Sequence, residues 1–272
     1  MSNSFELLIM IITHTNRIRV IALASIVCLT IIGGSFLSVN AQRPNSNRLP
    51  ILLIHGFAED SSIWNLWEDW LAANHFSKVY PIIFSSDELD DKCGSVAQHA
   101  TKLKSIVDKI LRDTGYEKVN IVAHSKGGLD ARWYIASSGS IDKVANLIMI
   151  GTPNSGSTAE FFENPIFTGC PSGSGKDLFP WSRATHVRDR PGNTNYYTIA
   201  GNWLPNKEAC WGLDDGGNCF IPGYDDGFVA VDSAESSPLY RYTSLGQLVP
   251  YYHLDLLAHR DVYERALPIL GG

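Results

Sequence analysis

One short stretch near the middle of the chain constrains the fold more than any other. Residues 119–123 form an apolar run typical of a buried strand, Ser125 follows, and Gly127 and Gly128 stand where a helix should begin. A strand that leads directly into a helix holds the residue between them in a sharp, strained turn. Its side chain is raised above the sheet, and the next backbone N–H lies nearby. The pattern predicts a nucleophilic serine at position 125.

The alternative is an ordinary glycine-rich turn. The usual form of the nucleophile turn is Gly-x-Ser-x-Gly, and Ala123 takes the place of its first glycine. Alanine is still small enough for the tight turn. Because five-residue matches of this kind arise by chance, the serine needs chemical partners elsewhere in the chain.

The rest of the chain alternates between short apolar runs and stretches with helical periodicity. We expect strands at 49–54, 79–84, 119–123, 144–150 and 196–200, and helices at 61–74, 95–114, 127–136 and 254–267. The expected strands are apolar on both faces, as in a parallel sheet that helices cover on both sides. The sequence predicts an α/β protein with a mostly parallel central sheet.

Residues 154–195 interrupt this alternation. They are rich in Gly, Pro and Ser, and their large aromatic residues are Phe161, Phe162, Phe167, Phe179 and Trp181. An insertion here lies above the carboxyl ends of the strands, where such sheets bind ligands. We expect a cap or lid with an apolar lining. A surface loop with a small core of its own is the alternative.

Composition favours one domain over residues 42–272. The chain has 272 residues, of which 44% are hydrophobic and 18% charged, which suits a single sizeable core. The formal net charge is −6 and the basic residues do not cluster. A nucleic-acid partner is therefore not expected.

Residues 1–41 differ from the rest of the chain. Arg17 and Arg19 precede an apolar run at 20–39, and small residues then lead to a cleavage site after Ala41. This is the layout of a secretory signal peptide. The apolar run is also just long enough to cross a bilayer, so an uncleaved anchor is the alternative. We expect a protein that is either secreted or held at a membrane.

The cysteines fit export. Of five, Cys28 lies in the N-terminal apolar run, and the remaining four are an even set that favours two disulfides. Cys210 and Cys219 are close in sequence and are expected to pair, and the pair Cys93–Cys170 then follows by elimination. Four cysteines allow three pairings in all. Metal ligation is disfavoured because no Cys-x-x-Cys spacing occurs.

A nucleophilic serine also needs two backbone N–H groups that face the developing oxyanion. Lys126 supplies one, because it directly follows Ser125. The loop after the first expected strand contains His55-Gly56-Phe57, and the Phe57 N–H is the candidate for the second. We expect His55 itself to be a buried structural histidine.

The acid and base are expected after the serine in chain order. His253 stands just before an apolar helical stretch, in a loop at the upper edge of the sheet, and is the expected base. His259, on that helix, is expected at the surface. Asp226 is the first choice for the carboxylate that orients the imidazole, Asp225 the second and Asp232 the third.

Several motifs occur together in an order known from one family. They are His55-Gly56-Phe57, residues 123–132, residues 151–157, Asp226-Gly227-Phe228-Val229 and His253-Leu254-Asp255. The chain resembles the α/β-hydrolase fold of bacterial-type secreted triacylglycerol lipases and esterases over most of residues 49–270, most weakly at 158–222. The serine motif is similar to that of Bacillus-type lipases, and the last two motifs to those of Pseudomonas and Burkholderia lipases.

The resemblance implies a carboxylic-ester hydrolase that acts on esters or lipids through an acyl-enzyme, with contact to a lipid interface and no required cofactor. Ser125, Asp226 and His253 would form the triad, and Phe57 and Lys126 the oxyanion hole. A polyester depolymerase or an amidase would use the same groups. A non-catalytic lipid-binding surface protein is the alternative from another class.

Two positions depart from the family pattern. Asn154 stands where the family usually has His, and Lys126 where a larger apolar residue or Gln is more common. We expect the Lys126 charge at the rim of the site, where it would disfavour long, bare acyl chains.

Some of these lipases bind Ca²⁺ through the aspartate two residues after the histidine and a second aspartate upstream of the catalytic acid. Asp255 matches the first position, and Asp214 or Asp215 the second. A helix cap at Asp255 and turn residues at 214 and 215 are the alternatives.

Overall fold

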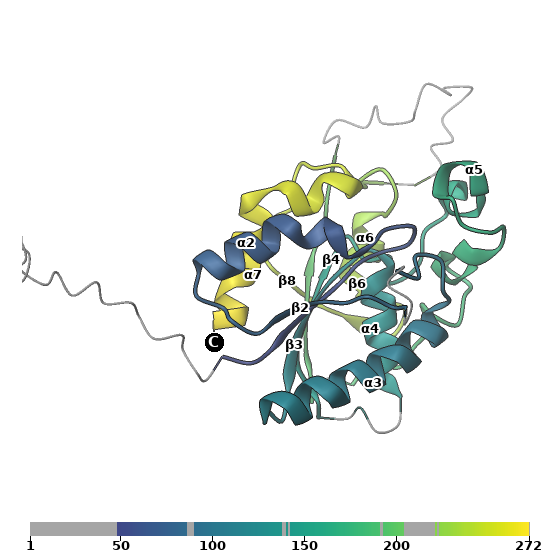
Figure 1. Ribbon diagram of the computed structural model, residues 1–272. Helices are drawn as coiled ribbons and strands as arrows, with labels where there is room; N and C mark the ends of the chain where they lie inside the picture. Colours follow the sequence, from purple (N-terminus) through teal and green to yellow (C-terminus); the bar gives the residue numbers. More distant parts are fainter. Residues whose placement is uncertain are drawn as a thin grey trace, which may run out of the picture. The chain divides into compact units, whose positions relative to one another are not determined.

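A parallel sheet forms the centre of the fold (Figure 1). The computed structural model describes residues 48–85, 90–137, 140, 142–190, 193–203, 221 and 223–271. Within them the main sheet has the strand order β2-β1-β3-β4-β5-β8, with every pairing parallel. The strands are β1 (Ile51–Ile54), β2 (Val79–Pro81), β3 (Val119–His124), β4 (Val144–Ile150), β5 (Asn195–Ile199) and β8 (Thr243–Ser244).

Helices cover both faces of this sheet. Helices α2 (Asn65–Ala73) and α7 (Arg260–Gly271) lie on one face, and α3 (Val96–Thr114) and α4 (Lys126–Ala136) on the other (Figure 1). Successive side chains of a strand point to opposite faces. In β1, Ile51 and Leu53 accordingly pack in the cluster on the α2 and α7 side, and Leu52 and Ile54 in the opposite one. Burying one such side chain contributes about 1.5–3 kcal/mol.

The α3 helix begins and ends where its sequence specifies. Ser95 Oγ accepts from the Gln98 N–H (3.3 Å), and Gln98 Oε1 accepts from the Ser95 N–H (2.9 Å). These two bonds form a capping box that satisfies N–H groups otherwise unpaired at a helix start. Gly115 ends the helix with φ +73°, a left-handed conformation that favours glycine.

The predicted α/β class and parallel sheet are confirmed, with three corrections to the elements. The helix predicted at 61–74 is the 3₁₀ helix η1 (Ser61–Trp64) followed by α2. The strand predicted at 79–84 stops at Pro81, which has no N–H to donate. The single helix predicted at 254–267 is two elements, the 3₁₀ helix η4 (His253–Ala258) and α7. Between them His259 adopts an extended backbone, and its ring stacks on Tyr251.

Outside the insertion at 154–195, four short elements were not expected. They are α6 (Val231–Glu235), the hairpin strands β6 (Ser236–Ser237) and β7 (Tyr240–Arg241), and β8. Strands of two residues are too short to carry a periodic pattern.

The insertion at 154–195 contains η2 (Glu160–Glu163), α5 (Pro165–Thr168) and η3 (Ser174–Leu178). Its buried side chains join one apolar cluster with residues from α4 and from the loops around the sheet. The cluster includes Phe162, Leu178 and Ala184 from the insertion and Phe57, Leu129 and Phe228 from elsewhere. The described part of the insertion therefore shares its core with the rest of the molecule. We call the insertion the cap, and its role as a cover over the site stays a prediction.

The described residues belong to one compact unit, Pro44–Gly272. The predicted signal peptide or anchor at 1–41 lies outside them, as does the predicted Cys210–Cys219 bond. In the part of the chain that the structure describes, helices are too short or too polar to cross a membrane.

Candidate active site

The candidate site lies where the sheet topology reverses direction. The chain leaves β1 through α2 on one face of the sheet, and leaves β3 through α4 on the other. The loops after these adjacent parallel strands therefore diverge, which opens a crevice at their carboxyl ends. Gly56 and Phe57 follow β1, and Ser125 follows β3, so the two loops meet in this crevice.

Ser125 occupies the strained turn between β3 and α4. Its φ is +52° and its ψ −128°, a conformation that a non-glycine residue rarely adopts. The helix start packs against β1 so closely that a Cβ on Gly127 would lie 2.5 Å from the His55 carbonyl oxygen. Glycine at 127 permits this approach, and the approach holds the serine in its strained conformation.

Three side chains from distant segments, those of Ser125, His253 and Asp226, form a hydrogen-bonded chain, which we call the file. His253 Nε2 lies 2.9 Å from Ser125 Oγ, and His253 Nδ1 lies 2.7 Å from Asp226 Oδ2. Asp226 Oδ1 accepts from the N–H groups of Phe228 (3.0 Å) and Val229 (2.8 Å), which fixes the carboxylate. All three members of the file are buried. A neutral His253 can thus donate to Asp226 through Nδ1–H and accept the serine proton at Nε2.

The other expected carboxylates and histidine lie outside this file. Asp225 accepts from the Gly227 N–H (2.7 Å), and burial raises its pKa. Asp232 is exposed in the first turn of α6. His259 stacks on Tyr251, between η4 and α7. Among the three aspartates considered, the geometry therefore favours Asp226.

The two candidate oxyanion donors flank Ser125. Lys126 is the first residue of α4, and the Gly56–Phe57 loop is so close that a Cβ on Gly56 would lie 2.7 Å from Ser125 Cβ. Neither the Phe57 nor the Lys126 N–H donates a hydrogen bond to another described residue. Both amides are therefore free to stabilise a negative charge beside Ser125.

The expectation for the Lys126 side chain is wrong. Its ammonium is buried and not at the rim of the site, with Nζ 2.8 Å from Asp130 Oδ1 and 3.1 Å from His99 Nδ1. Asp130 lies one helical turn further along α4, so the two side chains share a helix face. A buried ammonium needs such a partner, and the paired charge gives no reason to exclude long acyl chains.

His55 is buried, as its predicted structural role requires. Its Nδ1 lies 2.9 Å from Gly56 O and its Nε2 3.1 Å from Asp90 Oδ1. Burial lowers the pKa of His55, but the hydrogen bond and charge of Asp90 outweigh it, so the pKa is raised. Among the described residues, the two polar partners of His55 are therefore Gly56 and Asp90 and not Ser125 or His253.

The sequence analysis missed a second imidazole–carboxylate pair beside the file. His124 Nδ1 lies 2.8 Å from Glu59 Oε2, and His124 Nε2 lies 3.1 Å from the His253 carbonyl oxygen. The signal available was a histidine at the end of a buried strand, since a buried imidazole needs a partner. The partner could not be read from the sequence, because Glu59 is 65 residues away.

It also missed an ion pair that ties the cap to α4. Arg132 Nε donates to Asp189 Oδ1 (2.9 Å), and its Nη1 donates to Asn154 O (2.9 Å). Asn154 Nδ2 in turn donates to Ala234 O (2.7 Å). Asn154, one of the two departures from the family pattern, thus joins the start of the cap to α6.

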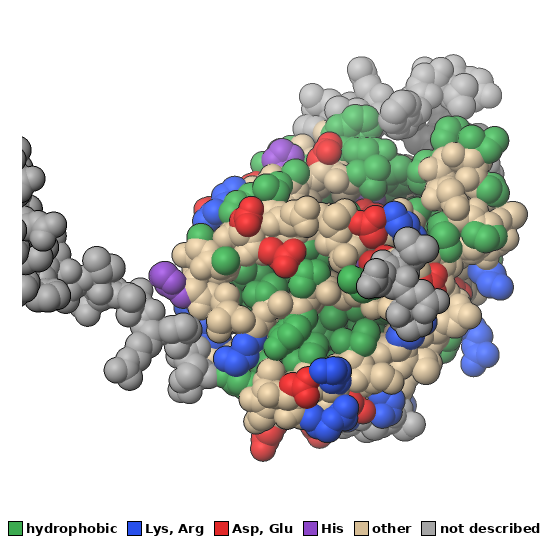
Figure 2. Space-filling model, in the orientation of Figure 1, with side chains coloured by type: hydrophobic (Ala, Val, Ile, Leu, Met, Phe, Trp, Pro, Cys, Tyr) green, Lys and Arg blue, Asp and Glu red, His purple; other side chains and the backbone are tan. Residues whose placement is uncertain are grey.

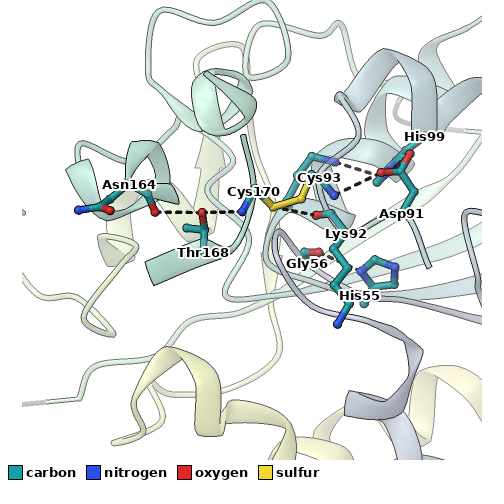
Figure 3. Close-up of a disulfide and its surroundings, with 10 residues drawn as sticks. His55, Gly56, Asp91, Lys92, Cys93, His99, Asn164, Thr168 and Cys170 are labelled. Atoms are coloured by element: carbon teal, nitrogen blue, oxygen red, sulfur yellow. Dashed lines mark hydrogen bonds and ion pairs between the residues drawn. A yellow bond between two sulfur atoms is a disulfide. The ribbon is translucent and has the colours of Figure 1, made fainter. Parts of the chain in front are cut away.

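The Cys93–Cys170 disulfide joins the cap to the body at another point (Figure 3). Cys93 lies just before α3, and Cys170 just after α5. Asp91, which lies on the same loop as Cys93, is beside His99 of α3 (Figure 3).

Aromatic side chains connect the cap to the file of Ser125, His253 and Asp226. The Phe162 ring lies 6.2 Å from that of Phe57, and the Phe161 ring 4.8 Å from that of Phe228. The Phe228 ring in turn lies 5.4 Å from the His253 ring. These three distances are between ring centroids. The surroundings of the file on this side are therefore apolar.

The calcium expectation gains no support from the described residues. Asp255 is exposed near the start of η4, and its N–H donates to Tyr252 O (2.9 Å). Among the side chains that the structure describes, no three His, Cys, Asp or Glu groups converge as a metal site would need. Asp214 and Asp215 lie outside the described residues, so calcium binding stays a prediction.

The parallel sheet order, with a strained residue between β3 and α4, defines the α/β-hydrolase fold. Residues 50–200, more than half of the chain, match the palmitoyl protein thioesterase family, and the chain belongs to that family.

The chain is also similar to two lipases in sequence and to one solved lipase structure in fold. The chain is 30% identical over 141 residues to a triacylglycerol lipase of Burkholderia plantarii (50% of this chain, 38% of that one). It is 31% identical over 133 residues to a triacylglycerol lipase of Pseudarthrobacter phenanthrenivorans (47% of this chain, 40% of that one). The match thus spans about two fifths of these relatives. The mature Bacillus licheniformis lipase BlEst2 superposes with a TM-score of 0.63 and 21% identity, over 84% of this chain and 94% of that one.

Proposed function

We propose that this chain is a secreted serine hydrolase of the lipase and esterase type that cleaves carboxylic esters through an acyl-enzyme. The observation that carries the proposal is the file from Ser125 through His253 to Asp226, with a distance of 2.9 Å at its first step and 2.7 Å at its second. Nucleophile, base and orienting carboxylate within hydrogen-bond reach are the parts that acyl transfer needs.

In the proposed reaction, Ser125 Oγ attacks the ester carbonyl carbon while its proton passes to His253 Nε2. The negative charge that forms on the carbonyl oxygen is stabilised by the N–H groups of Phe57 and Lys126. Asp226 stabilises the imidazolium through His253 Nδ1–H. The imidazolium then gives its proton to the departing alcohol, and the acyl group stays on Ser125. Water, deprotonated by His253, releases the acid and restores the serine.

The surroundings of the file support an acyl chain as the substrate's apolar part. Phe57, Phe161, Phe162 and Phe228 form continuous ring contacts that reach His253. Burying one CH₂ group contributes about 0.8 kcal/mol, so such a lining favours substrates with longer acyl chains. The two lipase relatives support the same substrate class.

A thioester with the same acyl chain is the second candidate substrate. It is favoured by the match of residues 50–200 to the palmitoyl protein thioesterase family. Attack and oxyanion stabilisation are identical, and only the leaving atom changes from oxygen to sulfur.

Contact with a lipid surface is part of the proposal. Hydrophobic side chains gather on the surface over α5 (Figure 2), where Ile166 is 89% and Phe167 67% exposed. Exposed apolar groups beside an active site suit an enzyme whose substrate lies in a membrane or droplet. Secretion is proposed from the signal-like residues 1–41, and the Cys93–Cys170 disulfide agrees with an oxidising compartment.

The test compares the purified full chain with its Ser125→Ala variant on p-nitrophenyl esters from acetate to stearate, and on matched acyl thioesters. We expect wild-type hydrolysis that Ser125→Ala reduces by about 10⁵-fold, because no other group replaces the nucleophile. Circular dichroism provides the folding control. Full activity in the variant, or a wild-type chain that cleaves neither class, would refute the proposed function and leave the non-catalytic lipid-binding alternative.

A further inference from the structure

Glu59 connects two parts of the candidate site without belonging to the file. It lies in the loop after β1, and its Oε2 accepts from the Gly56 N–H (2.7 Å) and lies 2.8 Å from His124 Nδ1. Gly56 is directly followed by Phe57, whose N–H is the proposed oxyanion donor. The Glu59 carboxylate therefore fixes the peptide that precedes this donor.

His124 extends the connection to the catalytic base. It is the last residue of β3, directly before Ser125, and its Nε2 lies 3.1 Å from the backbone oxygen of His253. The His124 and His253 rings are 4.8 Å apart between centroids. One imidazole thus joins the loop of the oxyanion donor, the strand of the nucleophile and the loop of the base.

The partners of His124 determine its protonation state. A carboxylate oxygen and a backbone carbonyl oxygen both accept hydrogen bonds, and a neutral imidazole has a single N–H to donate. Both bonds can form together only when His124 is an imidazolium, so the pair with Glu59 is charge-assisted. The bond from Gly56 N–H to the same carboxylate agrees with an ionised Glu59.

The charges around the pair agree with this state. Burial lowers the pKa of His124, but the charge and hydrogen bond of Glu59 outweigh it, helped by the His253 carbonyl and the Asp226 charge, so the pKa is raised. Burial raises the pKa of Glu59, but His124 and, more weakly, His253 and the Gly56 N–H lower it below its ordinary value.

The space around Gly56 is so small that its backbone can hardly move. A Cβ at position 56 would lie 2.5 Å from Glu59 Oε2 and 2.7 Å from Ser125 Cβ. The peptide of Gly56 is therefore confined between the carboxylate and the nucleophile. A shift of Glu59 would move the neighbouring Phe57 N–H relative to the position of the oxyanion.

We propose that Glu59 and His124 form a positioning pair that sets the oxyanion loop and the His253 loop at their working distances from Ser125. The pair touches no reacting atom, and its role rests on the hydrolysis proposed above. It acts on kcat because the positions it fixes matter most when charge develops on the carbonyl oxygen.

The kinetic test uses Glu59→Gln, His124→Gln and the double variant on a soluble p-nitrophenyl ester, with active sites counted by a fluorophosphonate. We expect each single variant to lower kcat by about 10- to 100-fold, as small misplacements of catalytic groups do, and to change KM by less than about 3-fold. Because the two residues act as one unit, the double variant should lose about as much as either single variant. Exposed Glu117→Gln and His186→Gln are the matched controls, with unchanged kcat.

A spectroscopic test does not depend on turnover. In ¹⁵N-labelled Ser125→Ala protein at neutral pH, we expect both ring nitrogens of His124 to be protonated, with the signals assigned by their loss in Ser125→Ala/His124→Gln. Adding Glu59→Gln should remove one ring proton, because the charged partner is gone. A merely space-filling role for Glu59 predicts no such change.

The outcomes separate this inference from the proposed function. Losses that add in the double variant, an unchanged kcat in both single variants, an effect on KM alone, or a single ring proton on His124 in the presence of Glu59 would each overturn the positioning pair. A wild-type chain without hydrolytic activity overturns the proposed function instead, and the His124 spectra still decide whether the charged pair exists.

Discussion

The sheet and the cap of this molecule are held by different interactions. In the sheet, continuous parallel ladders join the strands, and buried apolar side chains form a cluster on each face. In the described part of the cap, the helices are short. The cap is joined to the body by a shared apolar cluster, by polar links such as Arg132 with Asp189, and by the Cys93–Cys170 disulfide. The file of Ser125, His253 and Asp226 stands in loops at the edge of the sheet, and the cap contributes aromatic rings nearby.

From this difference between sheet and cap we infer that the file would carry out the proposed reaction and that the cap would select the substrate. The ladders on both sides of β3 hold the turn at Ser125 in its strained conformation. Changes in the file should therefore affect all substrates equally, and changes on the cap surface should affect only some of them.

The largest effect is expected at the file. Asp226→Asn keeps the shape of the side chain but removes the charge that orients His253, and kcat should fall by about 10⁴-fold. The loss should be the same from acetate to stearate esters, measured as initial rates at saturating substrate. Asp225→Asn, one residue away and hydrogen-bonded to the Gly227 N–H, is the control and should change kcat by less than about 10-fold. A loss confined to long acyl chains would mean that the file and the cap are not separable.

The next effect is expected at the link between the two regions. Asp189→Ala leaves the buried Arg132 guanidinium without its carboxylate, and should lower the free energy of unfolding by about 3–5 kcal/mol. Asp113→Ala, which breaks an exposed pair with Lys109, should cost only about 0.3–0.5 kcal/mol. Urea unfolding measures both values. Equal losses would show that the buried link does not hold the cap to α4.

The pair of Glu59 and His124 should make the stability of the folded protein depend on pH. The pKa of Glu59 is lowered from 4.5, so its contribution is present above pH 4.5 and is lost as pH falls through the folded pKa. The pKa of His124 is raised from 6.5, so its contribution is complete below pH 6.5 and is lost as pH rises through the folded pKa.

The difference in unfolding free energy between wild type and the double variant Glu59→Gln/His124→Gln should therefore be largest between pH 4.5 and 6.5. Its size there should be about 1.5–3 kcal/mol, as for hydrogen bonds to charged groups. Urea unfolding across pH 3–9 (about the range over which these groups titrate) measures it. A difference that is constant over this range would exclude a charged pair.

The smallest effect on stability is expected on the cap surface. Phe167→Ser on α5 should change the free energy of unfolding by less than about 0.5 kcal/mol, because this side chain is 67% exposed. Hydrolysis of an emulsified triacylglycerol should fall several-fold, while that of a soluble p-nitrophenyl ester should not change. Leu239→Ser, similarly exposed between β6 and β7, is the control for a general loss of surface hydrophobicity. Equal losses on both substrates would argue against contact of α5 with lipid.

The same contrast explains how far the sequence could lead. Strands β1, β3 and β4 are predictable because they are apolar on both faces, and Ser125, Asp226 and His253 because each stands in a short local motif. Local sequence patterns do not predict ion pairs or hydrogen bonds between residues that are far apart in the sequence. Arg132 and Asp189 are 57 residues apart, and Asp189 resembles any loop aspartate until the fold buries it.

Lys126 illustrates the same limit. A lysine next to Ser125 is expected in solvent on the basis of its charge alone. Only the helix geometry of α4 and the approach of His99 from α3 explain why its ammonium is buried.

Labelling by a fluorophosphonate tests the central claim most directly, because the reagent reacts with a serine only when a base and oxyanion donors activate it. Peptide mapping of the labelled full chain should place the phosphonyl group on Ser125, with fluoride lost, and should find much slower labelling in His253→Ala than in the wild type. A chain that takes up no label, or that carries it on another serine, would contradict the account.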